Sequence, residues 1–97
     1  MESVHKLYTL IIDFKGGTFI TQALADDILS ASKKCLANWD ITDISALICD
    51  SDISKIVSEI DEDYFIEVSN MQNVWCASLN IGRNLMLLNL VETNNAT

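Results

Sequence analysis

The sequence predicts an α+β fold, in which two β-hairpins form a four-stranded antiparallel sheet and two to three helices between them pack on one face. Alternating apolar residues flank a glycine near each end of the chain, which is the pattern of a β-hairpin. Between the hairpins the apolar residues recur with a helical period. Helices in that position bury their apolar stripes most simply against one side of the sheet.

The first hairpin is predicted from strands over about 6–14 and 18–24, joined by Gly16-Gly17 as a two-residue turn. Such turns favour glycine because their central residues adopt positive φ. This turn places Phe14 opposite Phe19, which gives the hairpin one largely apolar face.

The second hairpin is predicted from strands over about 74–81 and 85–91, joined by Gly82-Arg83. Leu79 then lies opposite Met86, and the face that they share is apolar throughout. A longer loop around the same glycine is the alternative, and it would shift the pairing.

Three short helices are expected between the hairpins, over about 26–37, 43–49 and 52–60. The first begins where two aspartates suit the helix N-terminus. The apolar stripe changes phase at Asp50-Ser51-Asp52, and this break predicts separate second and third helices.

The remaining segments are less regular. We expect residues 64–68 to form a short strand or an extended lead-in, and residues 92–97 to form a frayed tail. Residues 1–97 are expected to make a single domain, because the length is close to the common domain size.

The net charge of −8 is concentrated in the acidic segment, which we define as residues 40–67. That segment holds nine acids and one base, whereas acids and bases cancel in the rest of the chain. Nucleic acid is not an expected partner, because phosphate binding needs clustered Lys and Arg. The acids form a candidate patch for a basic protein partner, or else a solvated helix face. The candidate patch comprises Asp50, Asp52, Asp61, Glu62 and Asp63.

The second face of the predicted sheet mixes polar and apolar residues, and it is the candidate interface. A contiguous apolar patch usually marks a contact surface, and a homodimer is its simplest use. The alternative is that these side chains are exposed, or are covered by the terminal segments. The candidate interface comprises Ile11, Ile20, Leu85, Leu87, Asn89 and Val91. The role of Ser78, Asn80 and Asn89 on this face is not defined by the sequence.

No catalytic, metal or cofactor site is expected. His5 is the only histidine, and the three cysteines, which we expect to be buried and reduced, lack the spacing of a metal or redox motif. Trp39, Trp75 and Cys76 are the candidates to line a pocket between sheet and helices. Core packing is the commoner role of such tryptophans.

The opening hairpin followed by a helix resembles the HicB-type antitoxins in element order, over about the first forty residues. No specific motif carries the resemblance, and the DNA-binding segment of that family has no counterpart in this sequence. We therefore carry no function over from it.

The sequence thus favours a cytoplasmic, non-enzymatic protein-interaction or self-assembly module. No stretch reaches the roughly 20 apolar residues of a membrane-spanning helix, so a membrane is not an expected partner. The alternatives are a small-molecule-binding domain with a sheet–helix pocket, and an acidic inhibitor that blocks a basic partner as an antitoxin does.

Overall fold

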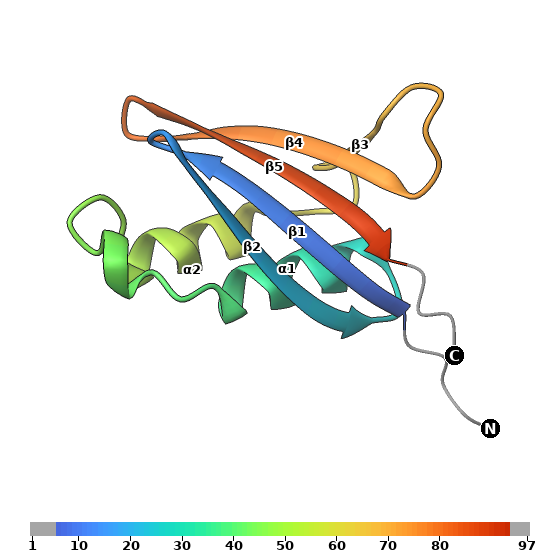
Figure 1. The fold of residues 1–97 in the computed structure, drawn as a ribbon, viewed down its shortest axis with the longest axis horizontal. Helices are drawn as coiled ribbons and strands as arrows, with labels where there is room; N and C mark the ends of the chain where they lie inside the picture. The colour runs from blue at the N-terminus through green and yellow to red at the C-terminus, as the bar shows by residue number, and fades with distance from the viewer. Residues whose placement is uncertain (1–5, 94–97) are drawn as a thin grey trace.

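The computed structural model describes residues 6–93 and contains one antiparallel sheet and two α-helices (Figure 1). The sheet has five strands in the order β2-β1-β5-β4-β3. In chain order the strands and helices are β1 (Lys6–Phe14), β2 (Gly17–Ala25), α1 (Ile28–Asn38), the 3-10 turn η1 (Thr42–Ile44), α2 (Asp50–Glu59), β3 (Ile66–Glu67), β4 (Val74–Ile81) and β5 (Asn84–Thr93).

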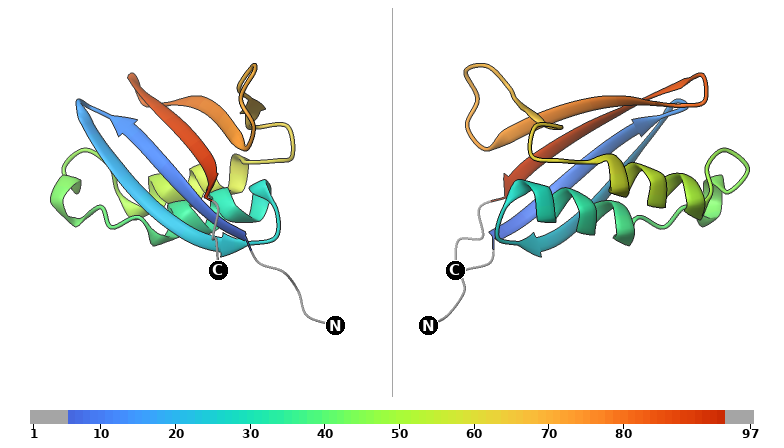
Figure 2. Two further views of the ribbon diagram at one scale, coloured as in Figure 1. Left: turned by 45° about the vertical axis from the view of Figure 1, so that its right-hand side comes forward. Right: turned by 180° about the vertical axis from the view of Figure 1, so that it is seen from behind.

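Both helices lie on the same side of the sheet, so the molecule has a sheet layer and a helix layer (Figure 2). The two hairpins are joined edge to edge, because β1 pairs with β5 over most of its length, with Ile12 opposite Leu88. The predicted α+β class with an antiparallel sheet is confirmed. Within residues 6–93, no helix or strand covers the other side of the sheet.

The predicted number of strands is one too low. Residues Ile66 and Glu67 form β3, which pairs with Cys76 and Trp75 of β4. A short strand was one of the two expectations for residues 64–68, but only two residues take part, and a strand of that length is too short for its alternation to assign it to the sheet.

The first hairpin turns one residue earlier than predicted. Lys15 and Gly16 both have positive φ (+54° and +81°), as a type I′ turn requires, and Gly17 pairs with Phe14 as the first residue of β2. The predicted pairing of Phe14 with Phe19 is therefore shifted by two residues. A shift of two keeps every side chain on its predicted face, so the apolar pattern does not distinguish the two registers.

The second hairpin has the predicted register, with Leu79 opposite Met86 and Ile81 opposite Asn84. Gly82 adopts a φ of +62° in its turn, which glycine does without steric cost.

The helices begin and end at positions that their hydrogen bonds explain. Asp27 caps α1, because its Oδ1 accepts a hydrogen bond from the Ser30 N–H at 2.8 Å, so the helix starts at Ile28 rather than at residue 26. The predicted helix over 43–49 is wrong, since only the η1 turn forms there. Residues 45–47 are exposed, so this stretch has no buried stripe to stabilise a longer helix.

The C-terminal strand is longer than predicted. β5 continues to Thr93, and Glu92 pairs with Tyr8 and donates its N–H to the Asn73 carbonyl at 2.9 Å. The expected frayed tail over 92–97 is therefore wrong for residues 92 and 93, and residues 94–97 lie outside the described part of the chain.

The core lies between the sheet and the helices. Its centre is fully buried and apolar, and it is lined by β1, β5 and α1. A polar contact beside the core also links the layers, because the Thr21 hydroxyl donates to the Cys35 carbonyl at 3.0 Å. The fully buried side chains include Leu10, Ile12, Leu36, Met86, Leu88 and Leu90.

The register of the first hairpin is testable with Lys15→Asn. We expect this change to raise the free energy of unfolding by about 0.5 kcal/mol, because Asn tolerates positive φ better than Lys and Asn-Gly is the favoured type I′ pair. The measurement is urea denaturation, with Thr18→Asn in β2 as the control that should lower stability. If Gly16-Gly17 were the turn instead, Lys15 would lie in a strand and Lys15→Asn would also be destabilising.

Candidate interaction surfaces

The side of the sheet opposite the helices, which we call the outer face, has a central row in which Asn89 is the one polar member. This row crosses all five strands, with Ile20 on β2, Ile11 on β1, Asn89 on β5, Cys76 on β4 and Ile66 on β3. The two end residues are 65% and 67% exposed, so the row reaches solvent at both edges of the sheet.

More apolar side chains continue this surface on both sides of the central row. All six residues of the candidate interface lie on the outer face. Leu24 and Ile66 belong to the same surface but were not among the predicted residues. Leu24 is four residues after Ile20 on the same strand, and this even spacing was the available signal. The most exposed aliphatic side chains of the outer face are Ile20, Leu24, Ile66, Leu85 and Leu87.

The outer face carries almost no charge. Asp13 is the only charged residue at an outward-facing strand position within residues 6–93, and its carboxylate accepts a hydrogen bond from the Thr18 hydroxyl at 2.7 Å. Polar neighbours bond to one another, because Gln22 Nε2 donates to the Thr9 hydroxyl, which is also 2.6 Å from the Thr93 hydroxyl. Because these polar groups already have hydrogen-bond partners, burying them in a contact would cost less free energy than burying unpaired ones.

The three polar residues that the sequence left undefined have different surroundings. Asn89 is half-buried in the central row, between Ile11 and Cys76. Ser78 and Asn80 are exposed and lie toward the C-terminal end of β4, near the hairpin turn.

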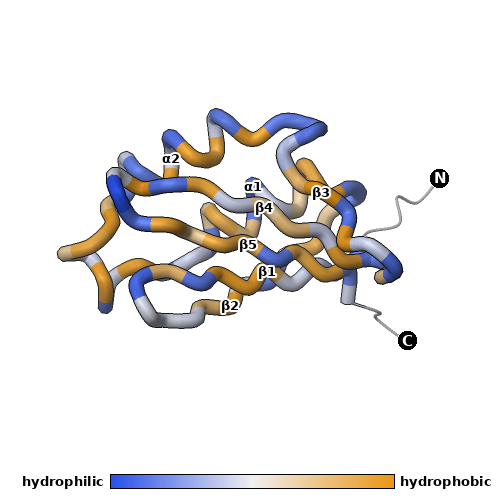
Figure 3. Tube along the Cα trace, turned by 90° about the horizontal axis from the view of Figure 1, so that it is seen from above, coloured by the Kyte–Doolittle hydropathy of each residue, from blue (hydrophilic) through white to orange (hydrophobic). Residues whose placement is uncertain are grey.

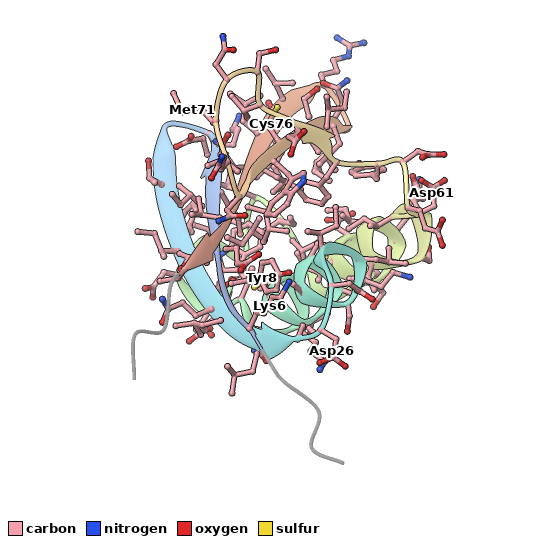
Figure 4. The ribbon with its side chains drawn as sticks, turned by 90° about the vertical axis from the view of Figure 1, so that its right-hand side faces the viewer. Lys6, Tyr8, Asp26, Asp61, Met71 and Cys76 are labelled. Atoms are coloured by element: carbon pink, nitrogen blue, oxygen red, sulfur yellow. The ribbon has the colours of Figure 1, made fainter. Side chains whose placement is uncertain are left out.

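The acidic residues form two groups rather than one patch. Asp50 and Asp52 lie in the first turn of α2, whereas residues 61–63 follow its last turn. A helix of ten residues separates them by roughly 15 Å. Asp61, labelled in Figure 4, lies on the helical side of the molecule, away from Cys76 on the sheet.

Asp52 has a local structural role. The Cys49 N–H, at the N-cap of α2, donates to Asp52 Oδ2 at 3.0 Å. This hydrogen bond, with a second from the Cys49 thiol, lowers the pKa of Asp52 below its ordinary value. Asp40 has a lowered pKa for a similar reason, since it accepts hydrogen bonds from the hydroxyl and the N–H of Thr42.

The structure does not bring Trp39, Trp75 and Cys76 together. Trp75 faces the helices, where its ring lies 6.3 Å from that of Tyr8, and its neighbour Cys76 faces the opposite side of the sheet. Trp39 is buried against Phe19, with ring centroids 5.3 Å apart. Trp75 and Cys76 therefore lie on opposite faces and cannot line the same side of a pocket.

A cavity of about 470 Å³ lies between α1 and α2, and Trp39 is part of its wall. Leu36, Ile53 and Val57 are among its apolar lining residues, and Lys33 and Asp50 also line it. The indole N–H of Trp39 is buried and has no hydrogen-bond partner within the described residues. A buried donor without a partner costs roughly 1–3 kcal/mol.

The three cysteines differ in how deeply they are buried. Cys35 is buried, which raises the pKa of its thiol, but Cys49 is exposed and Cys76 half-buried, so the expectation of three buried thiols is wrong for two of them. The pKa of Tyr8 is raised mainly by burial and, to a smaller extent, by the nearby Glu92 carboxylate.

The described residues contain no cluster of three His, Cys, Asp or Glu side chains that would hold a metal ion.

No helix within residues 6–93 has the length and apolar character needed to cross a membrane. No protein-family model, no curated protein and no solved structure matches this chain.

The hydrogen bond at the start of α2 predicts a pH-dependent contribution to stability. Because the pKa of Asp52 is lowered in the folded state, its contribution is present above the ordinary value of 3.8 and is lost as pH falls through the folded pKa. We expect Asp52→Asn to lower the melting temperature at neutral pH, and the difference from the parent protein to vanish in strong acid.

Thermal unfolding followed by circular dichroism across that pH range measures the effect. Glu62→Gln, which removes one exposed charge outside the helix, is the control and should change the melting temperature little at either pH. An Asp52→Asn deficit that stays the same in strong acid would contradict the role given to this carboxylate.

Proposed function

We propose that this protein is a non-catalytic protein-interaction module that assembles with a second copy of itself through the outer face of its sheet. The observation that supports this most strongly is the outer face itself, which carries apolar side chains on each of its five strands, is nearly uncharged and is uncovered within residues 6–93. Large apolar patches of this kind are uncommon on monomeric proteins and usually mark an interface.

The size of the face fits a dimer. Four strands of eight to ten residues and the two-residue β3, at about 3.3 Å per residue and spaced by about 4.8 Å, give a projected area on the order of 600 Å². A specific interface typically buries roughly 800 Å² on each partner, which is accessible rather than projected area. Two such sheets pack face to face at a spacing of about 10 Å.

The distribution of charge favours a second copy as the partner. A net charge of −8 would make two copies repel each other, but the excess acids lie in the acidic segment, most of which forms η1, α2 and the loops that flank α2 on the helical side. Packing outer face against outer face places both acidic segments on the outside of the dimer, where water and salt screen them.

A second candidate function is the binding of a basic partner protein by the acidic segment. It is favoured by the exposure of Asp50, Asp61, Glu62 and Asp63, whose charges reach solvent, and by Lys55 being the only base in that segment. Such an association would weaken strongly as salt is added. It uses a different surface from the dimer, so both functions are compatible in one protein.

The test of the proposed dimer is Leu87→Lys, measured by sedimentation equilibrium. Leu87 is 41% exposed on β5 and lies on the outer face. We expect the substitution to weaken self-association by more than about tenfold, because an unpaired lysine buried in an apolar contact costs more than about 1.4 kcal/mol.

Leu47→Lys is the matched control. Leu47 is 44% exposed, nearly the same as Leu87, but it lies in the segment between η1 and α2, on the helical side. It should leave self-association unchanged. A parent protein that stays monomeric at high concentration, or an equal effect of the two substitutions, would contradict the proposal.

A further inference from the structure

The β4 strand has an open edge beyond its short partner. On one side, β4 pairs with β5 from Val74 to Ile81. On the other side, β3 pairs only with Trp75 and Cys76. Within residues 6–93, the stretch 77–81 of β4 therefore has no strand beside it on that side.

The hydrogen-bond pattern shows which backbone groups point to this open edge. The Val68 N–H donates to the Val74 carbonyl at 3.0 Å, so Val74 directs its backbone groups toward the β3 side. In an antiparallel sheet this direction alternates along a strand, so Ser78 and Asn80 point the same way. Their outward N–H and C=O groups have no hydrogen-bond partner in the described part of the chain.

The opposite edge of the sheet is protected, and this contrast makes the β4 edge informative. On β2, the carbonyl of Gln22 accepts a hydrogen bond from Asn38 Nδ2, and the carbonyl of Leu24 accepts one from Lys34 Nζ. Side chains of α1 thus cover part of that edge, which is a common protection against unwanted strand pairing. No side chain does the same for Ser78 and Asn80 within residues 6–93.

A groove of about 280 Å³ runs below the open edge, between β4 and α2. Figure 3, which looks onto the outer face, shows α2 alongside β4 beyond the border of the sheet. Ile56 and Leu79 give the groove apolar walls. Two acids, Asp52 and Glu59, and one base, Lys55, lie around it, so its charge is negative.

We propose that this open edge binds an extended segment of a partner protein as an added strand, with a Lys or Arg side chain in the groove near Glu59. The backbone of the segment would bond to Ser78 and Asn80, which is the β-augmentation mode of peptide recognition. Since side chains alternate along a strand, the residue opposite Leu79 points toward α2, as Leu79 does. A basic side chain at that point would complement the carboxylates.

A second copy of this chain does not suit the edge. Pairing two β4 strands would bring two acidic segments side by side at close range, and like charges oppose that approach. The site uses the backbone edge of β4 and the groove beneath it, whereas the proposed dimer uses the side chains of the outer face, so the two are tested by different measurements.

The test is a selection of random dodecapeptides displayed on phage against the full-length protein, followed by binding measurements on the enriched peptides. We expect enriched sequences to carry Lys or Arg among β-branched residues. Hydrogen exchange with a bound peptide should slow the amides of Ser78 and Asn80. Asn80→Pro removes an outward N–H that has no partner within residues 6–93, so the fold should persist and the affinity should fall.

Charge reversal with a matched control completes the test. Glu59→Lys and Glu62→Lys change the net charge equally, but only Glu59 lines the groove. We expect Glu59→Lys to weaken peptide binding by about tenfold or more, as for the loss of a charged hydrogen bond, and Glu62→Lys to have little effect. Selection of no peptides, protection of other amides, peptides without a basic residue, or equal effects of the two reversals would each overturn the proposal.

Discussion

The structure depends on a constraint of connectivity, since both helices belong to the single stretch of chain that connects the two hairpins. Residues 28–59 run from the β2 edge of the sheet to its β3 edge along one face. Both α1 and α2 therefore cover that face. The pairing of β1 with β5 then unites both hairpins into one surface, with Leu10 opposite Leu90 at the centre of the core. Most residues of β1 and β5 that face the helices are buried, and the alternate residues of the same strands form the outer face.

The same connectivity explains the two edges of the sheet. The chain enters α1 directly from β2, so side chains of α1, including Lys34, lie close enough to cap the carbonyls of that strand. At the other edge the chain arrives from α2 and pairs as β3 for only two residues before it turns back into β4. The sheet is thus protected at its β2 edge and open at its β4 edge. The carboxylates of Asp52 and Glu59, from the acidic segment, lie beside the open edge.

Much of this could be predicted from alternation and from turn chemistry. The second hairpin was predicted in its observed register because glycine suits the first position of the turn that forms there, where Gly82 has a φ of +62°. The first was not, because a shift of two residues between Gly16-Gly17 and Lys15-Gly16 leaves the faces unchanged. The open edge and its groove were out of reach, since they depend on how far β3 extends and on where α2 lies beside β4, and neither is encoded in a local pattern.

The three cysteines allow the most direct test of the outer face as a self-association surface. Cys76 lies in its central row, Cys49 is exposed on the helical side, and Cys35 is buried in the core. The measurement is the alkylation rate of each thiol by iodoacetamide, followed by mass spectrometry from dilute to concentrated protein. The account predicts that Cys76 becomes several-fold slower with concentration while Cys49 keeps its rate and Cys35 stays unreactive. A constant ratio of the Cys76 and Cys49 rates at all concentrations would contradict it.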